Sequence, residues 1–155
     1  MAILDVGCGS NLKGDVSVDL ELETIRVFVN HRNSSRVRDV ILADGNHLPF
    51  RENHFDKVVS HHVIEHTKTP LKFLKELIRV SKNEVEIKCP HKYSRNAKTP
   101  YHVSYFSKTW FSQVCSSLQQ KIRFDVSASN ENISIGFFVF PFFRPHEITL
   151  TIRKI

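Results

Sequence analysis

The sequence predicts one α/β domain whose sheet is mostly parallel, with an antiparallel strand near the C-terminus. Short runs rich in β-branched residues recur through the first 90 residues, and helical patterns follow the later ones. The early runs are nearly continuous in Ile, Val and Leu, as in parallel sheets, whereas the last runs alternate apolar and polar residues. The length of 155 residues suits one ordinary domain, which we assign to residues 1–155.

Five short strands are predicted in the first 90 residues. They lie at residues 2–6, 15–19, 39–43, 55–60 and 84–89. Their apolar runs leave few polar positions, which is the pattern of a parallel sheet covered on both faces. We therefore expect a sheet that is buried on both sides.

Two helices are predicted from apolar residues spaced three and four apart. The first spans residues 70–81 and begins at Pro70, a residue that suits a first helical turn. The second spans residues 108–118, with Ser107 as its N-cap. The apolar stripe of the second helix consists of Trp110, Phe111, Val114, Cys115 and Leu118.

The end of the chain changes character. Residues 122–128 and 148–153 both alternate apolar and polar side chains, which predicts two strands that return antiparallel. Between them lies an apolar run that includes Phe137–Phe143. These phenylalanines could belong to the core, to a wall for an apolar acceptor or to a subunit interface, and on the last ground we expect a homodimer.

Composition limits the class of protein. The three cysteines form no CxxC pair, and no segment near Met1 has the features of a secretory signal, so we expect a reducing, cytoplasmic setting. No stretch of transmembrane length is free of charge, so we expect no membrane association. The net charge of +6 permits an acidic partner such as a nucleic acid but does not require one.

The residues after the first three strands point to a nucleotide-like ligand, because ligands of such sheets bind at the carboxyl ends of the strands. Gly7-Cys8-Gly9 follows the first strand, Asp19 the second and Asp44-Gly45 the third. A dinucleotide fingerprint would need a third glycine at position 12, where the chain has Leu12, and an acidic residue farther on than Asp19. Residues 7–15 also leave room for little more than one turn, which predicts an abbreviated first crossover.

The motifs in this order resemble the class I S-adenosylmethionine-dependent methyltransferases, especially the type 11 group, and imply their Rossmann-like fold. The resemblance covers residues 2–111. It rests on ILDVGCGSN, VSVDLE, ILADGNHLPFRENHFDKVVSHHVIEH, PLKFLKELIRVSK and VEIKCPH. It implies a methyltransferase with S-adenosyl-L-methionine as its cofactor.

The resemblance also implies roles for individual residues. The methionine part of the cofactor would lie against Asp5 and the backbone of Gly7, Cys8 and Gly9, with His61 closing the site beside the methionine amine. Asp19 would hold the ribose. Asp44 would accept from the adenine amino group, with the backbone of Gly45 or Asn46 nearby. Residues 48–50 resemble the family's structural turn. Turn or capping chemistry is the alternative interpretation of the two aspartates.

Histidines near the carboxyl edge are the candidate catalytic bases, namely His62, His66 and His91, with His102 a further candidate. His62 to His66 also matches the H-x-x-E-H pattern of a group of zinc peptidases. Such a site needs a sustained helix and a third ligand, but residues 67–70 break the segment. We therefore predict no metal site from the sequence.

The methyl acceptor is not identified by any motif and could be a small molecule, a nucleic acid or a protein. A basic loop with Tyr93 and Tyr101 follows the fifth strand and could bind phosphates and stack a base. A solvated loop is the alternative. Because no single base stands out, a non-catalytic subunit that binds the cofactor or activates a partner is the alternative function.

Overall fold

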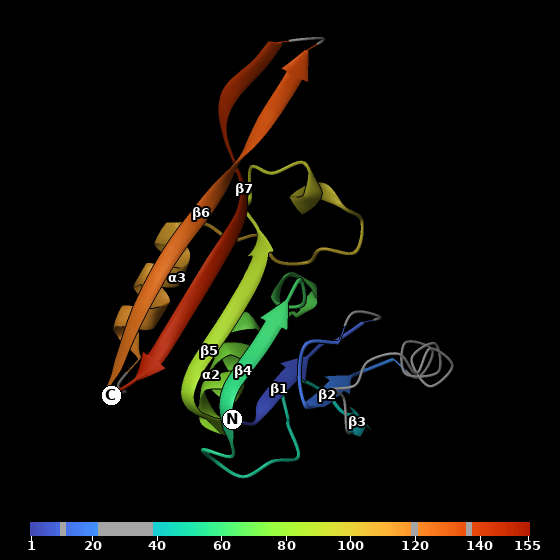
Figure 1. Ribbon diagram of the computed structural model, residues 1–155, viewed down its shortest axis with the longest axis vertical. Helices are drawn as coiled ribbons and strands as arrows, with labels where there is room; N and C mark the ends of the chain where they lie inside the picture. The colour runs from blue at the N-terminus through green and yellow to red at the C-terminus, as the bar shows by residue number, and fades with distance from the viewer. Residues whose placement is uncertain (10–11, 22–38, 119–120, 136–137) are drawn as a thin grey trace.

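The protein forms one seven-stranded mixed sheet with the strand order β3-β2-β1-β4-β5-β7-β6 (Figure 1). The computed structural model describes residues 1–9, 12–21, 39–118, 121–135 and 138–155, and for residues 131–144 it describes the backbone alone. The strands are β1 (Ile3–Val6), β2 (Val16–Asp19), β3 (Asp39–Leu42), β4 (Phe55–His61), β5 (Ser81–Pro90), β6 (Ile122–Ile135) and β7 (Phe138–Lys154).

The strand directions confirm the predicted fold class. Strands β1 to β5 pair parallel to their neighbours, whereas β7 runs antiparallel to both β5 and β6. The carboxyl ends of β1, β2, β3 and β4 therefore meet at one edge, where the predicted ligand-binding residues lie.

The helices confirm the predicted periodicity. Helix α2 (Pro70–Val80) begins with Pro70 in its first turn, and α3 (Lys108–Ser117) begins at Ser107, whose Oγ accepts from the Trp110 amide at 3.2 Å. Two short 3₁₀ helices, η1 (Ile64–His66) and η2 (Asn96–Lys98), lie in the loops after β4 and β5. No helix in the described ranges is long and apolar enough to cross a membrane.

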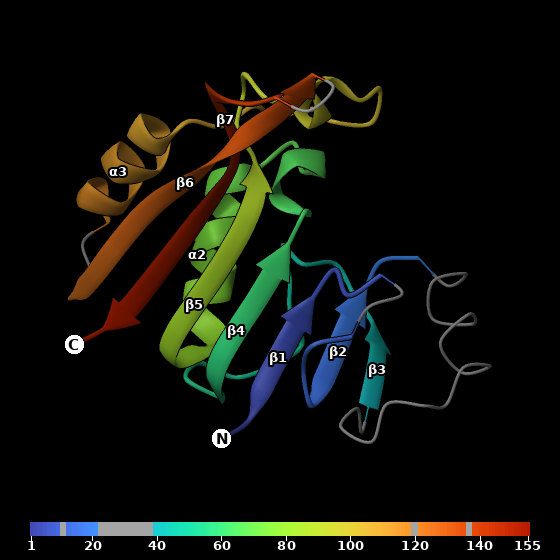
Figure 2. The same ribbon diagram turned by 45° about the horizontal axis from the view of Figure 1, so that its top comes forward.

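Helices α2 and α3 cover the same face of the sheet, which we call the helix-covered face (Figure 2). Leu74, Leu77 and Ile78 of α2 are fully buried there, and Phe111 of α3 belongs to the same apolar cluster. The strands contribute every second residue, such as Ile87 of β5. This single cluster is the hydrophobic core.

The opposite face of the sheet carries no helix in the part of the chain that the structure describes, and we call it the open face. It presents Glu84, Glu86 and Lys88 of β5, none of them fully buried, beside Lys57 of β4 and Thr151 of β7. The expectation of a sheet buried on both sides is therefore wrong for these strands. The physical reason is that β5 alternates charged and apolar residues, so only its apolar side is buried.

The abbreviated first crossover is confirmed in the described residues, since residues 7–9 and 12–15 form no helix between β1 and β2. The loop is fixed to β1 instead. Lys13 N donates to Asp5 Oδ2 at 2.8 Å, and Asp15 accepts from Ile3 N at 2.9 Å. A Cβ on Gly14 would lie 2.8 Å from Asp5 N and from Ile3 O, so glycine allows this close approach of two backbones.

Strands β6 and β7 continue beyond β5 as a hairpin (Figure 1), because β7 pairs with β5 only as far as Glu147 but with β6 as far as Phe138. Residues 138–143 of the predicted apolar run belong to β7 in this hairpin. Phe137 and the side chains of the other phenylalanines lie outside what the structure describes, so their roles in the core or in a dimer stay predictions.

Candidate functional site

A cavity of about 640 Å³ opens at the carboxyl ends of β1, β2 and β3 and extends to the segment after β4. This volume is in the usual range for pockets that bind a cofactor-sized ligand. The structure brings eight of the predicted site residues together in its lining, namely Gly7, Gly9, Asp19, Asp44, Gly45, Asn46, His62 and His66.

The glycine turn after β1 forms the floor of this cavity. Gly7 and Gly9 have φ values of +73° and +52°, in the region that favours glycine. A Cβ on Gly7 would lie 2.2 Å from Cγ2 of Val63, so no larger residue fits there. Gly7 N donates to Val18 O at 2.7 Å, which fixes the turn against β2. The turn therefore presents backbone to the cavity at the end of β1.

Asp19 connects the end of β2 to the glycine turn by a hydrogen bond. Its Oδ2 accepts from Gly9 N at 3.0 Å, and its Oδ1 accepts from Glu21 N at 3.1 Å. Asp19 thus has the turn chemistry that the alternative interpretation predicted. Oδ2 also accepts from Cys8 Sγ at 3.9 Å. A carboxylate oxygen has two lone pairs, so Oδ1 retains one acceptor position for a ligand in the cavity.

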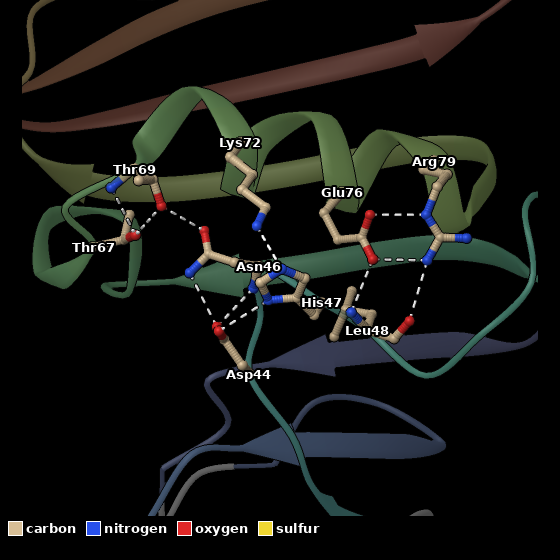
Figure 3. A network of polar contacts seen from close by, with 9 residues as sticks. All are labelled: Asp44, Asn46, His47, Leu48, Thr67, Thr69, Lys72, Glu76 and Arg79. Carbon is tan, nitrogen blue, oxygen red and sulfur yellow. Dashed lines mark hydrogen bonds and ion pairs between the residues drawn. The ribbon is translucent and has the colours of Figure 1, made fainter.

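Asp44 forms a tight turn after β3, shown in Figure 3. Asp44 Oδ1 accepts from Asn46 N at 2.8 Å and from Asn46 Nδ2 at 3.0 Å. The backbone hydrogen bond from Asn46 holds the pKa of Asp44 below its ordinary value, so the side chain is an anionic acceptor at neutral pH. Asn46 Oδ1 in turn accepts from Thr69 Oγ1 at 2.9 Å, which links this turn to the start of α2.

The loop that follows is anchored on α2 by an ion pair (Figure 3). Arg79 donates to Glu76 Oε1 at 2.7 Å and to the carbonyls of Leu48 and Phe50, while Glu76 Oε1 accepts from Leu48 N at 2.8 Å. The hydrogen bond from Arg79 holds the pKa of Glu76 below its ordinary value. Leu48 is buried in the core. This agrees with the structural turn predicted at residues 48–50.

Asp5 and Cys8 are not among the residues that line the cavity, and the roles predicted for Asp5 and for the Cys8 backbone stay predictions. Asp5 points to the open face, where it accepts from Lys13 N, and burial raises its pKa. The Cys8 side chain is buried beside Asp19, and this burial raises the pKa of its thiol to about 12. Both residues therefore help to hold the glycine turn in place, on the side that does not face the cavity.

His61 also lies outside the cavity lining, and its predicted place beside the methionine amine stays a prediction. Side chains alternate along β4, which turns His61 to the open face, and there its Nε2 lies 2.8 Å from Glu86 Oε1. Burial, with the nearby charge of Lys13, holds the pKa of His61 below its ordinary value. The neutral ring accordingly donates to the Glu86 carboxylate.

Two of the three predicted bases, His62 and His66, reach the cavity. His62 has φ +60° and lies between two carboxylates, with Nδ1 3.5 Å from Glu65 and Nε2 2.9 Å from Glu147. Its interaction with Glu65 raises its pKa. His91 borders a different hollow near Trp110, and burial lowers its pKa. The structure therefore does not place His91 with the other candidates.

The segment between β4 and α2 contributes cavity residues that the sequence analysis missed. They are Val63, Thr67, Lys68 and Thr69, together with Phe73 of α2. The sequence analysis also missed Glu65, which is 2% exposed directly behind this wall. The H-x-x-E-H pattern was the available signal for this segment. It was set aside because residues 67–70 break the sustained helix that a zinc peptidase site needs, and no third ligand was identified.

Residues 4–87, more than half of the chain, match a family model described as a methyltransferase domain. No curated protein matches the sequence. The matched segment includes the glycine turn, Asp19, Asp44 and the wall after β4.

Solved structures of low sequence identity share the fold. The YcgJ protein from Bacillus subtilis has a TM-score of 0.76 at 15% identity, over 98% of this chain and 91% of its own. A SAM-dependent methyltransferase from Aquifex aeolicus has a TM-score of 0.67 at 22% identity, over 100% and 82%. The chain bound to the Trm112 methyltransferase activator from Haloferax volcanii has a TM-score of 0.71 at 13% identity, over 98% and 80%.

Proposed function

This chain belongs to the methyltransferase-domain family whose model it matches, and on that premise we propose that it transfers a methyl group from S-adenosylmethionine to an acceptor bound beside His62 and His66. The observation that carries the proposal is the convergence of the glycine turn, Asp19 and Asp44 on one cavity of about 640 Å³. These are the groups that a single adenosine carrying methionine would need.

The residues at the end of each strand suggest how the cofactor would lie in the cavity. Asp44 and Asn46 at the end of β3 would bind the adenine, because the amide of Asn46 and the carboxylate of Asp44 offer a donor and an acceptor. Asp19 would accept from the ribose hydroxyls. The backbone of Gly7 and Gly9 would border the methionine, which directs the methyl group towards the wall formed after β4.

The chemistry requires little beyond this positioning. A lone pair of the acceptor forms the new bond to the methyl carbon, and the carbon–sulfur bond breaks with its electron pair going to sulfur, which loses its positive charge. Holding the two reacting atoms in line supplies much of the rate acceleration. Of the predicted bases, His62 and His66 lie near enough to the cavity to receive a proton from the acceptor.

Calorimetry with S-adenosylhomocysteine tests the cofactor site. We expect binding to the unmodified protein and an affinity about 10- to 100-fold lower in Asp19→Ala, because a hydrogen bond to a charged group contributes roughly 1.5–3 kcal/mol. Asp125→Ala is the matched control, since Asp125 is an exposed aspartate on β6. Equal affinity in Asp19→Ala would contradict the assigned site, and no binding at millimolar ligand by the folded protein would contradict the cofactor.

A non-catalytic subunit is the second candidate function, and one comparison makes it possible. The similar chain from Haloferax volcanii is a putative methyltransferase in complex with a methyltransferase activator, so this fold occurs together with a partner protein. Incubation with methyl-labelled S-adenosylmethionine and a fractionated host extract separates the two functions. Label in a small-molecule, nucleic-acid or protein fraction identifies the acceptor class, whereas a protein that binds cofactor but labels no fraction favours the subunit.

A further inference from the structure

Glu65, His66 and His102 form a cluster beside the cavity, and of these three residues the proposed function uses His66 alone. Glu65 and His66 belong to η1, and His102 comes from the loop after η2. One ligand atom from each side chain lies within 4.8 Å of the other two. We infer that these three residues bind a divalent transition-metal ion.

The Glu65 carboxylate is the strongest sign of a cation. The side chain is 2% exposed, and neither oxygen accepts a hydrogen bond from any residue that the structure describes. Two imidazole nitrogens lie near Oε1, namely Nδ1 of His62 at 3.5 Å and Nε2 of His102 at 4.0 Å, and both distances are long for hydrogen bonds. Burying a carboxylate that accepts no hydrogen bond costs several kcal/mol, and a bound cation would offset that cost.

The two histidines are oriented as ligands. Nδ1 of His102 lies 3.1 Å from Ala97 O, and Nδ1 of His66 lies 3.1 Å from Tyr101 O. A carbonyl can only accept, so both Nδ1 atoms carry the proton and both Nε2 atoms keep a lone pair. Metal-binding histidines commonly have this second hydrogen bond to a backbone carbonyl, because it fixes the tautomer and the ring orientation.

The backbone holds the two halves of the cluster together. Glu65 O accepts from Val103 N at 2.9 Å and from Ser104 N at 3.0 Å. Ser104 Oγ donates to Thr67 O at 2.9 Å. The loop that carries His102 is therefore hydrogen-bonded to the residues around η1 before any ion binds, as a preorganised site requires.

Two imidazoles and one carboxylate suit zinc and neighbouring first-row ions rather than magnesium or calcium, which prefer oxygen ligands alone. Ligand atoms of a tetrahedral zinc ion lie about 3.4 Å apart, so the cluster needs to contract by roughly 1 Å. The arrangement also differs from the zinc peptidase pattern. Glu65 is a ligand here instead of a base, and His62 is turned towards Glu147.

Three protein ligands leave a coordination position open, and His66 borders the cavity as well as the cluster. This part of the inference rests on the proposed function. An acceptor hydroxyl bound to the ion would lose its proton to solvent, form its bond to the methyl carbon and release the electron pair of the carbon–sulfur bond to sulfur. Such a site would select acceptors that carry a hydroxyl oxygen able to bind a metal ion.

Titration of the full chain with Co²⁺, followed by visible absorption, and with Zn²⁺, followed by calorimetry, tests the metal site. We expect one ion per chain and ligand-field bands of a site with fewer than six ligands. Glu65→Gln and His102→Ala should each lower the affinity at least about 100-fold. His54→Ala is the control, because His54 is exposed before β4, at the other end of that strand.

Glu65→Gln keeps the size of the side chain, so circular dichroism should show a folded variant. Absence of binding by the unmodified protein, or equal affinity in both ligand variants and the control, would overturn the metal site. S-adenosylhomocysteine binding is measured on the same samples. If the protein binds the metal but not S-adenosylhomocysteine, the proposed function is contradicted and the metal site is not. If it binds S-adenosylhomocysteine but not the metal, only the metal site is contradicted.

Discussion

The helix-covered face and the open face are formed by the same strands, yet they are held by different forces. Under α2 and α3 the strands bury side chains such as Val85, Ile87 and Leu150 at 0–1% exposure. On the open face the neighbouring residues form a row of ion pairs instead. Lys57 Nζ lies 2.9 Å from Glu84 Oε1 and 2.7 Å from Glu86 Oε2, and Arg153 Nε lies 3.0 Å from Glu84 Oε2.

This difference shows how a short chain can stabilise a sheet that has one face without helices. Burial of apolar area is the dominant favourable contribution to folding, so α2 and α3 account for most of the stability. Solvent-accessible ion pairs contribute little, but they make the open face compatible with water. In the part of the chain that the structure describes, α2 and α3 cover one face of the sheet alone, and the sheet still holds the cavity residues in place.

Leu77→Ala should give the largest loss of stability, because Leu77 is fully buried between α2 and the sheet. We expect a decrease of about 2–5 kcal/mol in the free energy of unfolding, measured by urea denaturation. Leu71→Ala is the matched control, since Leu71 is 42% exposed on the same helix. Similar losses in the two variants would contradict the assignment of this face as the core.

Gly45→Ala should have an intermediate effect where the helix-covered face meets the cavity. The added Cβ would lie 2.5 Å from Cε2 of Phe73 and 3.2 Å from Cγ1 of Val6. We expect a loss of roughly 1–3 kcal/mol together with weaker S-adenosylhomocysteine binding. Adding Phe73→Leu should restore part of the binding if the clash is the cause, and a strictly additive double variant would argue against a clash.

Glu86→Gln should have the smallest effect and should depend on pH. Burial opposes ionisation, but hydrogen bonds from Lys57 and His61 outweigh it and hold the pKa of Glu86 below its ordinary value. Its stabilisation is therefore present above the unfolded pKa of about 4.3 and is lost as pH falls through the folded pKa. Urea denaturation should show a difference below about 1 kcal/mol at pH 7 that disappears at lower pH. A difference that grows on acidification would contradict this sign.

The sequence was sufficient for the elements and for half of the candidate site. Strands and helices follow from local periodicity. Gly7, Asp19 and Asp44 each lie at the carboxyl end of a strand, so the edge they share follows from the parallel topology. Asp5, Cys8 and His61, which were also predicted for the site, are not among the residues that line the cavity. A side chain at the end of a strand can face the cavity or the opposite side of the sheet. Which of the two it faces depends on how the strand packs, and a residue's place next to a strand in the sequence does not specify this.

By itself the sequence determined the fold class, the order of the elements and the glycine and aspartate turns, because all of these depend on short-range patterns. Only the tertiary structure decided which face of the sheet stays open, and only it brought His102 to Glu65 and His66. The hydrogen bonds from Val103 and Ser104 to the Glu65 carbonyl close this long-range contact. Contacts of this kind arise when distant loops pack together, so no spacing in the sequence encodes them.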